Sequence, residues 1–266
     1  MLSFIQWNPS PDFVSYGHFS IKWYGVFWGL SLMSCFFIGN YVFKKLNRDN
    51  EKVTLLIQYM FIGGLIGARL AHIIFYSLDF YIAHPEDILA VWKGGLASHG
   101  GFVGAVIGLY LFCRVHSEFG FFWILDIGMV CVALLASLIR FGNLMNSELY
   151  GKPTDVPWAF VFQQVDNLPR HAVVLYESIS YFLIQILMLV LFNRYKESKP
   201  GLYIAVFLIT VFGIRFLLEF FKVPDGNMFG PISKTQLLNL PFIATGLLIT
   251  YFVSAKKLHY TNPIRK

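Results

Sequence analysis

The chain contains seven apolar stretches, each long enough to cross a lipid bilayer. About 20 residues of α-helix span a hydrocarbon core of roughly 30 Å. The stretches lie near residues 23–43, 54–77, 100–115, 121–145, 173–192, 201–221 and 237–255, and the third is short and rich in glycine. With 56% hydrophobic and 14% charged residues, the chain is also too apolar for a soluble domain of 266 residues. The sequence predicts an all-α integral membrane protein with about seven transmembrane helices.

Lysine and arginine gather on one side of these stretches, which predicts an orientation. The residues that follow the first, third, fifth and seventh stretches are Lys44, Lys45, Arg48, Lys52, Arg114, Arg194, Lys196, Lys199, Lys256, Lys257, Arg265 and Lys266. Positively charged loops stay in the cytoplasm. We therefore expect the N-terminus outside and the C-terminus in the cytoplasm. The net charge of +6 is explained by these loops, so no nucleic-acid partner is predicted.

The connections on the outer side are the longest, near residues 78–99 and 146–172. Long loops on a rigid scaffold are common places for functional residues. No internal repeat or shift in composition divides the chain, so residues 1–266 are predicted to form a single polytopic membrane domain. The N-terminal residues lack the basic region and small-residue cleavage site of a removable signal peptide, so we expect the first stretch to be a retained anchor.

Three arginines lie inside stretches that are otherwise apolar: Arg69, Arg140 and Arg215. A cation at the centre of a membrane helix costs roughly 2.5–3.5 kcal/mol, so such residues usually have a function. At 1.5 Å per residue the three lie about 22, 28 and 21 Å from the cytoplasmic ends of their helices. We expect them in the outer third of the bilayer, at the level of lipid phosphates. Arg69 taken alone is equally well explained by a side chain that reaches for the interface.

Other polar residues are predicted at the same level. They are Tyr24, His99, Asn143, Asn146, Glu148, Arg170, His171 and Glu219. Arg215 and Glu219 are one helical turn apart, so this carboxylate can orient the guanidinium. Tyr24 also fits the aromatic belt of a membrane interface. Amides and an acid seldom gather at a helix end in lipid without partners, which favours a site around Asn143, Asn146 and Glu148.

The three cysteines, Cys35, Cys113 and Cys131, all fall within apolar stretches. They form no Cys-x-x-Cys pair and have no histidine at ligand spacing, so neither a disulfide nor a zinc site is predicted. Each is interpreted as a small buried residue.

Six blocks of residues, taken together, are similar to one known family. They are Trp23-Tyr24-Gly25, His99-Gly-Gly, Arg140-x-Gly-Asn-x-x-Asn-x-Glu-x-x-Gly151, Arg170-His-x-x-x-Leu-Tyr-Glu177, Arg215-Phe-x-x-Glu219-Phe and Ile232-Ser233-x-x-Gln236-Leu. Their order and spacing cover nearly the whole chain, and the block from Arg140 to Gly151 is the most specific. The chain resembles the bacterial phosphatidylglycerol:prolipoprotein diacylglyceryl transferases.

Several positions depart from the usual pattern of that family. Ile139 and Ser147 replace glycines, Leu144 replaces an aromatic residue, Ala172 replaces a proline, and Lys234-Thr235 replaces a Met-Gly pair. None of these changes removes a charged residue of the expected site. Because of these changes, the resemblance does not predict the backbone conformation around Ser147 and Lys234.

The resemblance implies a reaction at the outer face of the bacterial inner membrane. The diacylglyceryl group of phosphatidylglycerol moves to the thiol of the lipobox cysteine in a prolipoprotein signal peptide, and glycerol phosphate is released. The chain's own cysteines lie away from the outer layer, so the attacking thiol comes from this partner. No metal or organic cofactor is implied.

Roles in this reaction can be assigned to the matching residues. Arg140 and Arg215 would bind the phosphate, because a guanidinium fork fits phosphate oxygens and keeps its charge in lipid. His99 would accept the thiol proton, with His171 as the rival base. Glu219 would hold Arg215. The remaining substrate-binding candidates are Tyr24, Arg69, Asn143, Asn146, Glu148, Gly151 and Arg170.

Two other functions remain as alternatives. A transporter or flippase for anionic lipid would also use arginines, but its ionisable residues are expected near the midplane and its sequence is expected to contain a repeat. An intramembrane serine hydrolase would need Ser98 or Ser147 as nucleophile. The chain has no Gly-x-Ser-x-Gly elbow, and Ser98 is adjacent in sequence to His99.

Overall fold

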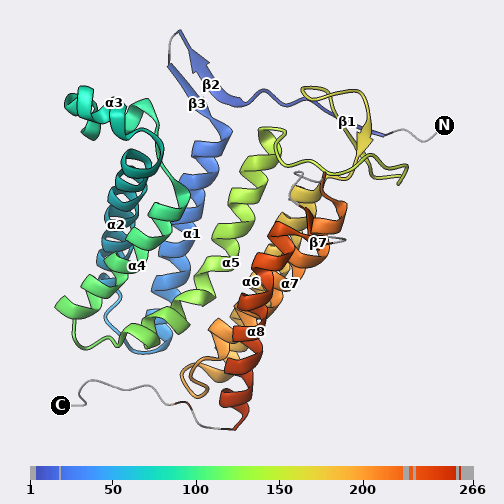
Figure 1. Cartoon of the computed structure of the whole chain (residues 1–266). Helices are drawn as coiled ribbons and strands as arrows, with labels where there is room; N and C mark the ends of the chain where they lie inside the picture. The colour runs from blue at the N-terminus through green and yellow to red at the C-terminus, as the bar shows by residue number, and fades with distance from the viewer. Residues whose placement is uncertain (1–3, 18, 224–227, 230–231, 256–257, 259–266) are drawn as a thin grey trace. The chain divides into compact units, whose positions relative to one another are not determined.

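The computed structural model describes residues 4–17, 19–223, 228–229, 232–255 and 258. Within them, seven helices are long and apolar enough to cross a membrane, as predicted (Figure 1). They are α1 (Trp23–Lys45), α2 (Glu51–Tyr76), α4 (Ser98–Val115), α5 (Phe121–Met145), α6 (Val173–Tyr195), α7 (Leu202–Leu218) with its 3₁₀ extension η3 (Glu219–Phe221), and α8 (Lys234–Ser254). Helix α8 begins earlier than predicted, because Ser233 and Gln236 form a capping box at its N-terminus.

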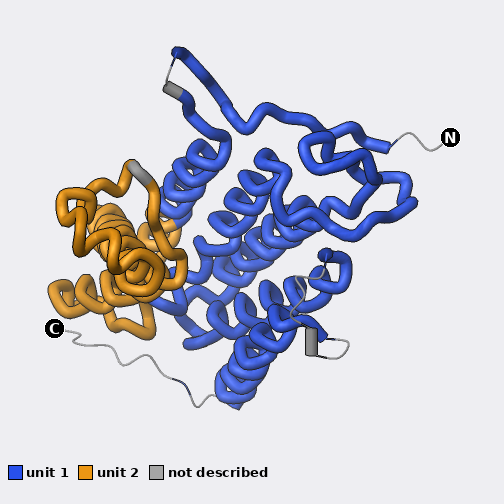
Figure 2. The backbone as a smooth tube through the Cα atoms, turned by 45° about the horizontal axis from the view of Figure 1, so that its top comes forward, with its two compact units in different colours: residues 1–38, 125–259 blue, residues 39–124, 260–266 orange. Residues whose placement is uncertain are grey.

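The chain divides into two compact units (Figure 2). Unit 1 contains residues 1–38 and 125–259, and unit 2 contains residues 39–124 and 260–266. Helices α1 and α5 contribute to both. The single domain and the orientation of the termini stay predictions. Lys256, Lys257, Arg265 and Lys266, which carry part of the charge bias, lie outside the described residues.

In unit 2, helices α2 and α4 run antiparallel with their backbones in contact. A Cβ atom on Gly104 would lie 2.1 Å from the carbonyl oxygen of Gly63, and one on Gly67 would lie 2.3 Å from that of Gly100. Such close approach is possible only for glycine, and small residues commonly mediate helix packing in membranes. The predicted outer loop after α2 is folded into three short helices, α3 (Leu78–Ala83), η1 (Pro85–Leu89) and η2 (Val91–Lys93).

In unit 1, helices α6, α7 and α8 run side by side (Figure 1). The carboxylate of Asp126, near the start of α5, accepts hydrogen bonds from the backbone N–H groups of Gly201 and Ile204 at the start of α7, both at 2.8 Å. The starts of α5 and α7 therefore share one end of the unit. The polar residues at the ends of α5 and α7 and at the start of α6 lie at the opposite end.

Short strands in unit 1 were not predicted, so the fold is mostly helical rather than purely helical. Strands β1 (Ile5–Trp7), β4 (Phe160–Phe162) and β5 (Pro169–Arg170) form one sheet in the order β1-β4-β5, in which β1 is parallel to β4. Strands β2 (Asp12–Tyr16) and β3 (Phe19–Lys22) form one hairpin, and β6 (Met228–Phe229) and β7 (Ile232–Ser233) form another. The first sheet packs with Leu144 and Val174 in a small core.

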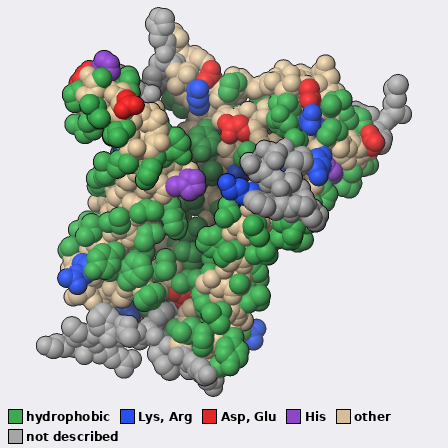
Figure 3. Space-filling view, in the orientation of Figure 1, with side chains coloured by type: hydrophobic (Ala, Val, Ile, Leu, Met, Phe, Trp, Pro, Cys, Tyr) green, Lys and Arg blue, Asp and Glu red, His purple; other side chains and the backbone are tan. Residues whose placement is uncertain are grey.

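The helices expose large apolar side chains along much of their length. Examples are Phe37, Phe61, Phe102 and Leu183, which are between 51% and 73% exposed. Figure 3 shows such hydrophobic side chains, in green, along the helical surfaces. Exposed apolar surface on this scale is unusual for a soluble protein and fits contact with lipid.

Candidate functional site

A fully buried carboxylate lies between two cations in unit 1. Glu177, in the second turn of α6, has no exposed surface. Its Oε2 atom is 2.7 Å from Nε of Arg140 on α5, and its Oε1 atom is 2.9 Å from Nζ of Lys222, just after η3. A buried charge is tolerated only when it is paired, and here both oxygens have a cation. The carboxylate thus connects three segments that are distant in sequence.

The predicted polar residues at the end of α5 are brought together around Arg140. The guanidinium Nη1 donates to Oδ1 of Asn143 at 3.3 Å, and Nδ2 of Asn143 donates to Glu148 at 3.0 Å. Asn146 donates to the other carboxylate oxygen of Glu148 at 2.8 Å. Asn143 is buried, whereas Glu148 is exposed. Arg140 is therefore held by side chains on both sides.

The prediction that Glu219 holds Arg215 is wrong in this structure. The carboxylate of Glu219 is 3.4 Å from Nζ of Lys222 and accepts a hydrogen bond from the hydroxyl of Ser233 at 3.2 Å. Lys222 and Ser233 both lie beyond the end of α7, and the carboxylate of Glu219 contacts them rather than Arg215. The Nε atom of Arg215 is buried and, among the described residues, has no hydrogen-bond partner.

Gly151 and His171 lie where three backbone segments cross. The N–H of Gly151 donates to the carbonyl of His171 at 2.8 Å, and Gly151 also pairs with Lys222 in a β-bridge. A Cβ atom at Gly151 would lie 2.7 Å from the carbonyl oxygens of both His171 and Phe221. The close packing of the backbone therefore requires glycine at position 151. His171 lies beside the segment that carries Lys222.

The imidazole of His171 is partly enclosed. Its ring packs edge-on against Phe221, with 5.0 Å between centroids, and Nδ1 lies 3.4 Å from the hydroxyl of Tyr176. Burial lowers the pKa of His171 below its usual value of 6.5, because desolvation disfavours the charged ring. The ring is therefore neutral at pH 7 and able to accept a proton.

Arg170 organises the loop that leads to α6. Its guanidinium forms an ion pair with Asp166, donates to the carbonyl of Gly151 at 3.2 Å, and lies 5.1 Å from the ring centroid of Tyr150. The hydrogen bonds from Arg170 lower the pKa of Asp166 below its usual value of 3.8. These contacts account for Arg170 without a substrate.

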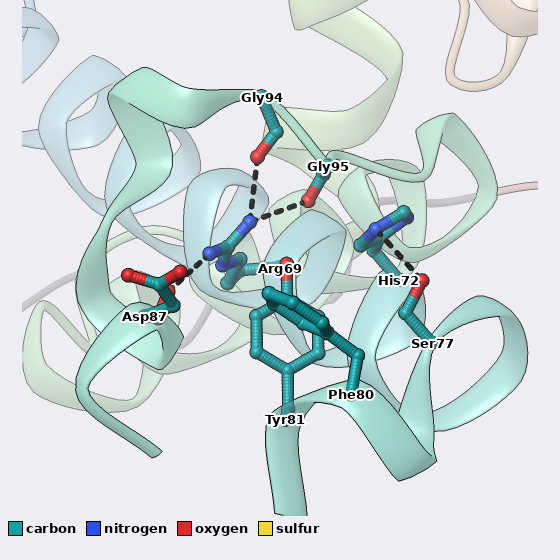
Figure 4. Close-up of a pocket in the computed structure, with 8 residues that line it drawn as sticks. All are labelled: Arg69, His72, Ser77, Phe80, Tyr81, Asp87, Gly94 and Gly95. Atoms are coloured by element: carbon teal, nitrogen blue, oxygen red, sulfur yellow. Dashed lines mark hydrogen bonds between the residues drawn. The ribbon is translucent and has the colours of Figure 1, made fainter. Parts of the chain in front are cut away.

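Arg69, in unit 2, is fully occupied by the folded loop after α2 (Figure 4). Its guanidinium donates to five backbone carbonyls, which are those of Asp87, Ile88, Ala90, Gly94 and Gly95. An arginine has five N–H donors, so none is left for a phosphate. The ring of Tyr81 lies 4.9 Å from the guanidinium carbon. In this conformation Arg69 has no N–H group left to bind substrate, as it was predicted to do.

His99 and Tyr24 occupy different units. His99 is exposed in the first turn of α4, in unit 2, and its imidazole makes no hydrogen bond to a described residue. Tyr24 starts α1 in unit 1 and lies against Gly142, where a Cβ atom would be 3.3 Å from its ring. Gly142 is on α5, two residues after Arg140, so Tyr24 borders the cluster around Arg140.

The departures from the family pattern leave the charged cluster intact. Ser147 has a φ of 56°, in the left-handed region that glycine adopts most easily, and its buried hydroxyl has no partner among the described residues. Leu144 is buried in the small core, and its carbonyl accepts a hydrogen bond from Trp7 at 3.1 Å. Lys234 and Thr235 form the first turn of α8, and its capping box is formed.

Sequence reasoning missed Glu177, Lys222 and Ser233 as site residues. Glu177 and Ser233 belong to two of the six blocks that carry the family resemblance, so the sequence did contain a signal for these two residues. Lys222 resembled an ordinary loop lysine, and only the folded structure brings it to Glu177. Among the residues that the structure describes, no group of three His, Cys, Asp or Glu side chains is placed to bind a metal.

Comparison with known proteins identifies the family. The family described as prolipoprotein diacylglyceryl transferase matches residues 11–252. A phosphatidylglycerol–prolipoprotein diacylglyceryl transferase of Tolumonas auensis is 40% identical over 256 residues, which cover 94% of this chain and 98% of that protein. The proteins of the same name from Chloroherpeton thalassium and Bacteroides fragilis are 44% and 37% identical, covering 94% and 97% of this chain and 94% and 98% of their own lengths. The chain is a multi-pass membrane protein that belongs to the prolipoprotein diacylglyceryl transferase family.

Proposed function

We propose that this protein transfers the diacylglyceryl group of phosphatidylglycerol to the lipobox cysteine of prolipoproteins. The names of its relatives state, for them, diacylglyceryl transfer between phosphatidylglycerol and prolipoprotein. The observation that carries the proposal is the geometry of Arg140. Its Nε atom is held by the buried Glu177, so the carboxylate does not take the two Nη groups that form the phosphate-binding fork. Arg215 in the same unit supplies a second guanidinium.

The reaction follows from these groups and the lipid. The cysteine sulfur attacks the glycerol carbon that bears the phosphate ester, a C–S bond forms, and the C–O bond breaks. The electron pair of that bond stays on the phosphate oxygen, so glycerol phosphate leaves as an anion. Fixed guanidinium donors stabilise charge that grows on the leaving oxygen.

The thiol must lose its proton to a base. We assign this role to His99, because its exposed imidazole is open to a second substrate and makes no hydrogen bond to a described residue. His171 is the rival, since its lowered pKa keeps the ring neutral at pH 7. Asn143, Asn146 and Glu148 would keep Arg140 in place rather than take part in proton transfer.

We also propose that the protein resides in the bacterial inner membrane with the site facing the periplasm. The N-terminus would lie outside and the C-terminus in the cytoplasm. This orientation is supported by the lysine and arginine residues that follow alternate helices. Prolipoproteins display their lipobox at the outer face of that membrane, where the proposed site would meet it.

The experiment that tests the function measures release of the headgroup. Purified protein is incubated with phosphatidylglycerol labelled in its terminal glycerol, together with a lipobox peptide that carries cysteine or, as the matched control, serine. We expect water-soluble glycerol phosphate with the cysteine peptide only. Release with either peptide, or with none, would indicate a hydrolase. Movement of lipid between leaflets without release would indicate a flippase.

A further inference from the structure

Glu177 is placed to control how Arg140 meets the substrate. We propose that Glu177 is a positioning residue for diacylglyceryl transfer, which fixes the guanidinium of Arg140 and couples it to the end of helix α7. This inference rests on the proposed function. Glu177 itself is not expected to touch substrate, because it has no exposed surface and each of its oxygens already has a cation.

Glu177 contacts the guanidinium of Arg140 at the edge that carries Nε. Oε2 of Glu177 lies 2.7 Å from Nε of Arg140, and Asn143 accepts one hydrogen bond from Nη1. Neither carboxylate oxygen of Glu177 has a hydrogen-bond partner among the described residues, so its contact with Nε is an ion pair. A guanidinium is planar, so the ion pair at Nε and the hydrogen bond from Nη1 to Asn143 together restrict the direction of the other N–H bonds. The carboxylate thus sets the orientation of the fork that binds phosphate.

The two helices that carry this pair are joined directly beside it. The hydroxyl of Ser137 on α5 donates to the carbonyl of Ser178 on α6 at 2.8 Å, and the hydroxyl of Ser178 donates back to the carbonyl of Ser137 at 2.9 Å. Ser137 is about one turn before Arg140, and Ser178 follows Glu177 in sequence. The ion pair therefore lies beside a hydrogen-bonded part of the contact between α5 and α6. Such support from neighbouring contacts keeps a site residue in a fixed position.

The second oxygen of Glu177 extends the connection to α7 and α8. Lys222 bridges Glu177 and Glu219, and Glu219 accepts from Ser233, the N-cap residue of α8. This chain of contacts ties the position of Arg140 to the end of α7, the helix that also carries Arg215. One buried carboxylate is thereby linked to both helices that supply the proposed phosphate cations.

A purely structural role for Glu177 makes a different prediction. Removing one partner of a buried ion pair strongly destabilises a protein, because the other charge is left unpaired. Loss of activity in a Glu177 variant would then follow only from loss of folded protein. A positioning role predicts lower turnover in molecules that remain folded.

The test uses three variants of the full-length protein in detergent, with kcat and KM for phosphatidylglycerol measured per folded molecule. Glu177→Gln removes the charge. Glu177→Gln combined with Lys222→Gln also removes one of the two cations that faced the lost carboxylate, which should return part of the lost thermal stability. Gln185→Leu is the matched control, because Gln185 is buried on α6 and bonds to the backbone of α5 at Val130 and Leu134, away from the cluster.

We expect kcat to fall about 10–100-fold in Glu177→Gln and to stay low in the double variant, because misplacement of a catalytic group by about 1 Å has effects of this size. Gln185→Leu should lose stability but keep its kcat. The inference is overturned if Glu177→Gln keeps the wild-type kcat, or if the double variant recovers it together with stability. Wild-type protein that shows no cysteine-dependent transfer would instead overturn the proposed function, and this inference with it.

Discussion

At the scale of single residues, the four arginines that the sequence assigns to the site differ in what their N–H groups already bind. Arg69 donates to five carbonyls, and Arg170 is paired with Asp166. Arg140 is held through Nε, and Nε of Arg215 has no described partner. The sequence predicted that cations would lie in the membrane, but it could not show which of them are satisfied by loop carbonyls, because those contacts exist only after folding.

Replacing each arginine by lysine should distinguish the arginines that are proposed to bind phosphate, Arg140 and Arg215, from Arg69, which binds backbone carbonyls. Arg140→Lys and Arg215→Lys keep the charge but lose the planar fork, so we expect transfer to fall by about 100-fold, the size seen when a transition-state donor is lost. Arg69→Lys serves as the matched control and should reduce thermal stability more than kcat. Near-normal transfer by both Arg140→Lys and Arg215→Lys would contradict their assignment to the phosphate.

The choice of base is tested by the two histidines. His99→Gln should lower turnover while binding of phosphatidylglycerol is retained, since the phosphate contacts lie on the arginines. Raising the pH should partly rescue this variant, because a cysteine with a pKa near 8.5 then ionises without a base. If His99→Gln turns over normally and His171→Gln binds lipid but is inactive, the roles of the two histidines are exchanged.

Ser147 provides a test of local strain. Its φ of 56° costs a residue with a side chain roughly 1–2 kcal/mol, and its buried hydroxyl has no described partner. Ser147→Gly should therefore raise Tm by a few degrees, at about 2–4 °C per kcal/mol. Ser180→Gly, inside helix α6, is the control and should lower Tm because glycine is unfavourable in helix interiors. A lower Tm for Ser147→Gly would show that this turn is not strained.

At the scale of elements, the helices could be predicted and the strands could not. Long apolar stretches have few alternatives in a membrane protein, so all seven helices were found with small differences at their ends. Strands of two to five residues give no clear alternation. The parallel pairing of β1 with β4 joins segments more than 150 residues apart, as in Ile5 with Phe160, and no local pattern specifies such a contact.

The contact between α2 and α4 should be sensitive to small changes in volume. Gly104→Ala would place a Cβ atom 2.1 Å from the carbonyl oxygen of Gly63, so the helices must separate. We expect reduced accumulation of folded protein and a lower Tm in detergent. Gly128→Ala, on α5, is the matched control, because its Cβ would meet nothing within 4 Å. Equal stability of the two variants would mean that α2 and α4 do not pack through these backbones.

At the scale of the whole molecule, the proposed orientation in the membrane rests on the distribution of charge alone. With the native cysteines replaced, a cysteine at Asn47 should be protected from an impermeant thiol reagent in cells with a permeabilised outer membrane. A cysteine at Asp155 should react. The opposite labelling pattern would reverse the topology and place the proposed site on the cytoplasmic side, away from exported lipoproteins.

In the proposed reaction a cysteine sulfur, and no other group, receives the diacylglyceryl unit. The most direct measurement is mass spectrometry of a lipobox peptide after incubation with purified protein and phosphatidylglycerol. We expect the peptide to gain one diacylglyceryl group on its cysteine, through a thioether linkage that survives hydroxylamine. An unmodified peptide, or a product in which lipid is attached by an ester or thioester that hydroxylamine removes, would contradict it.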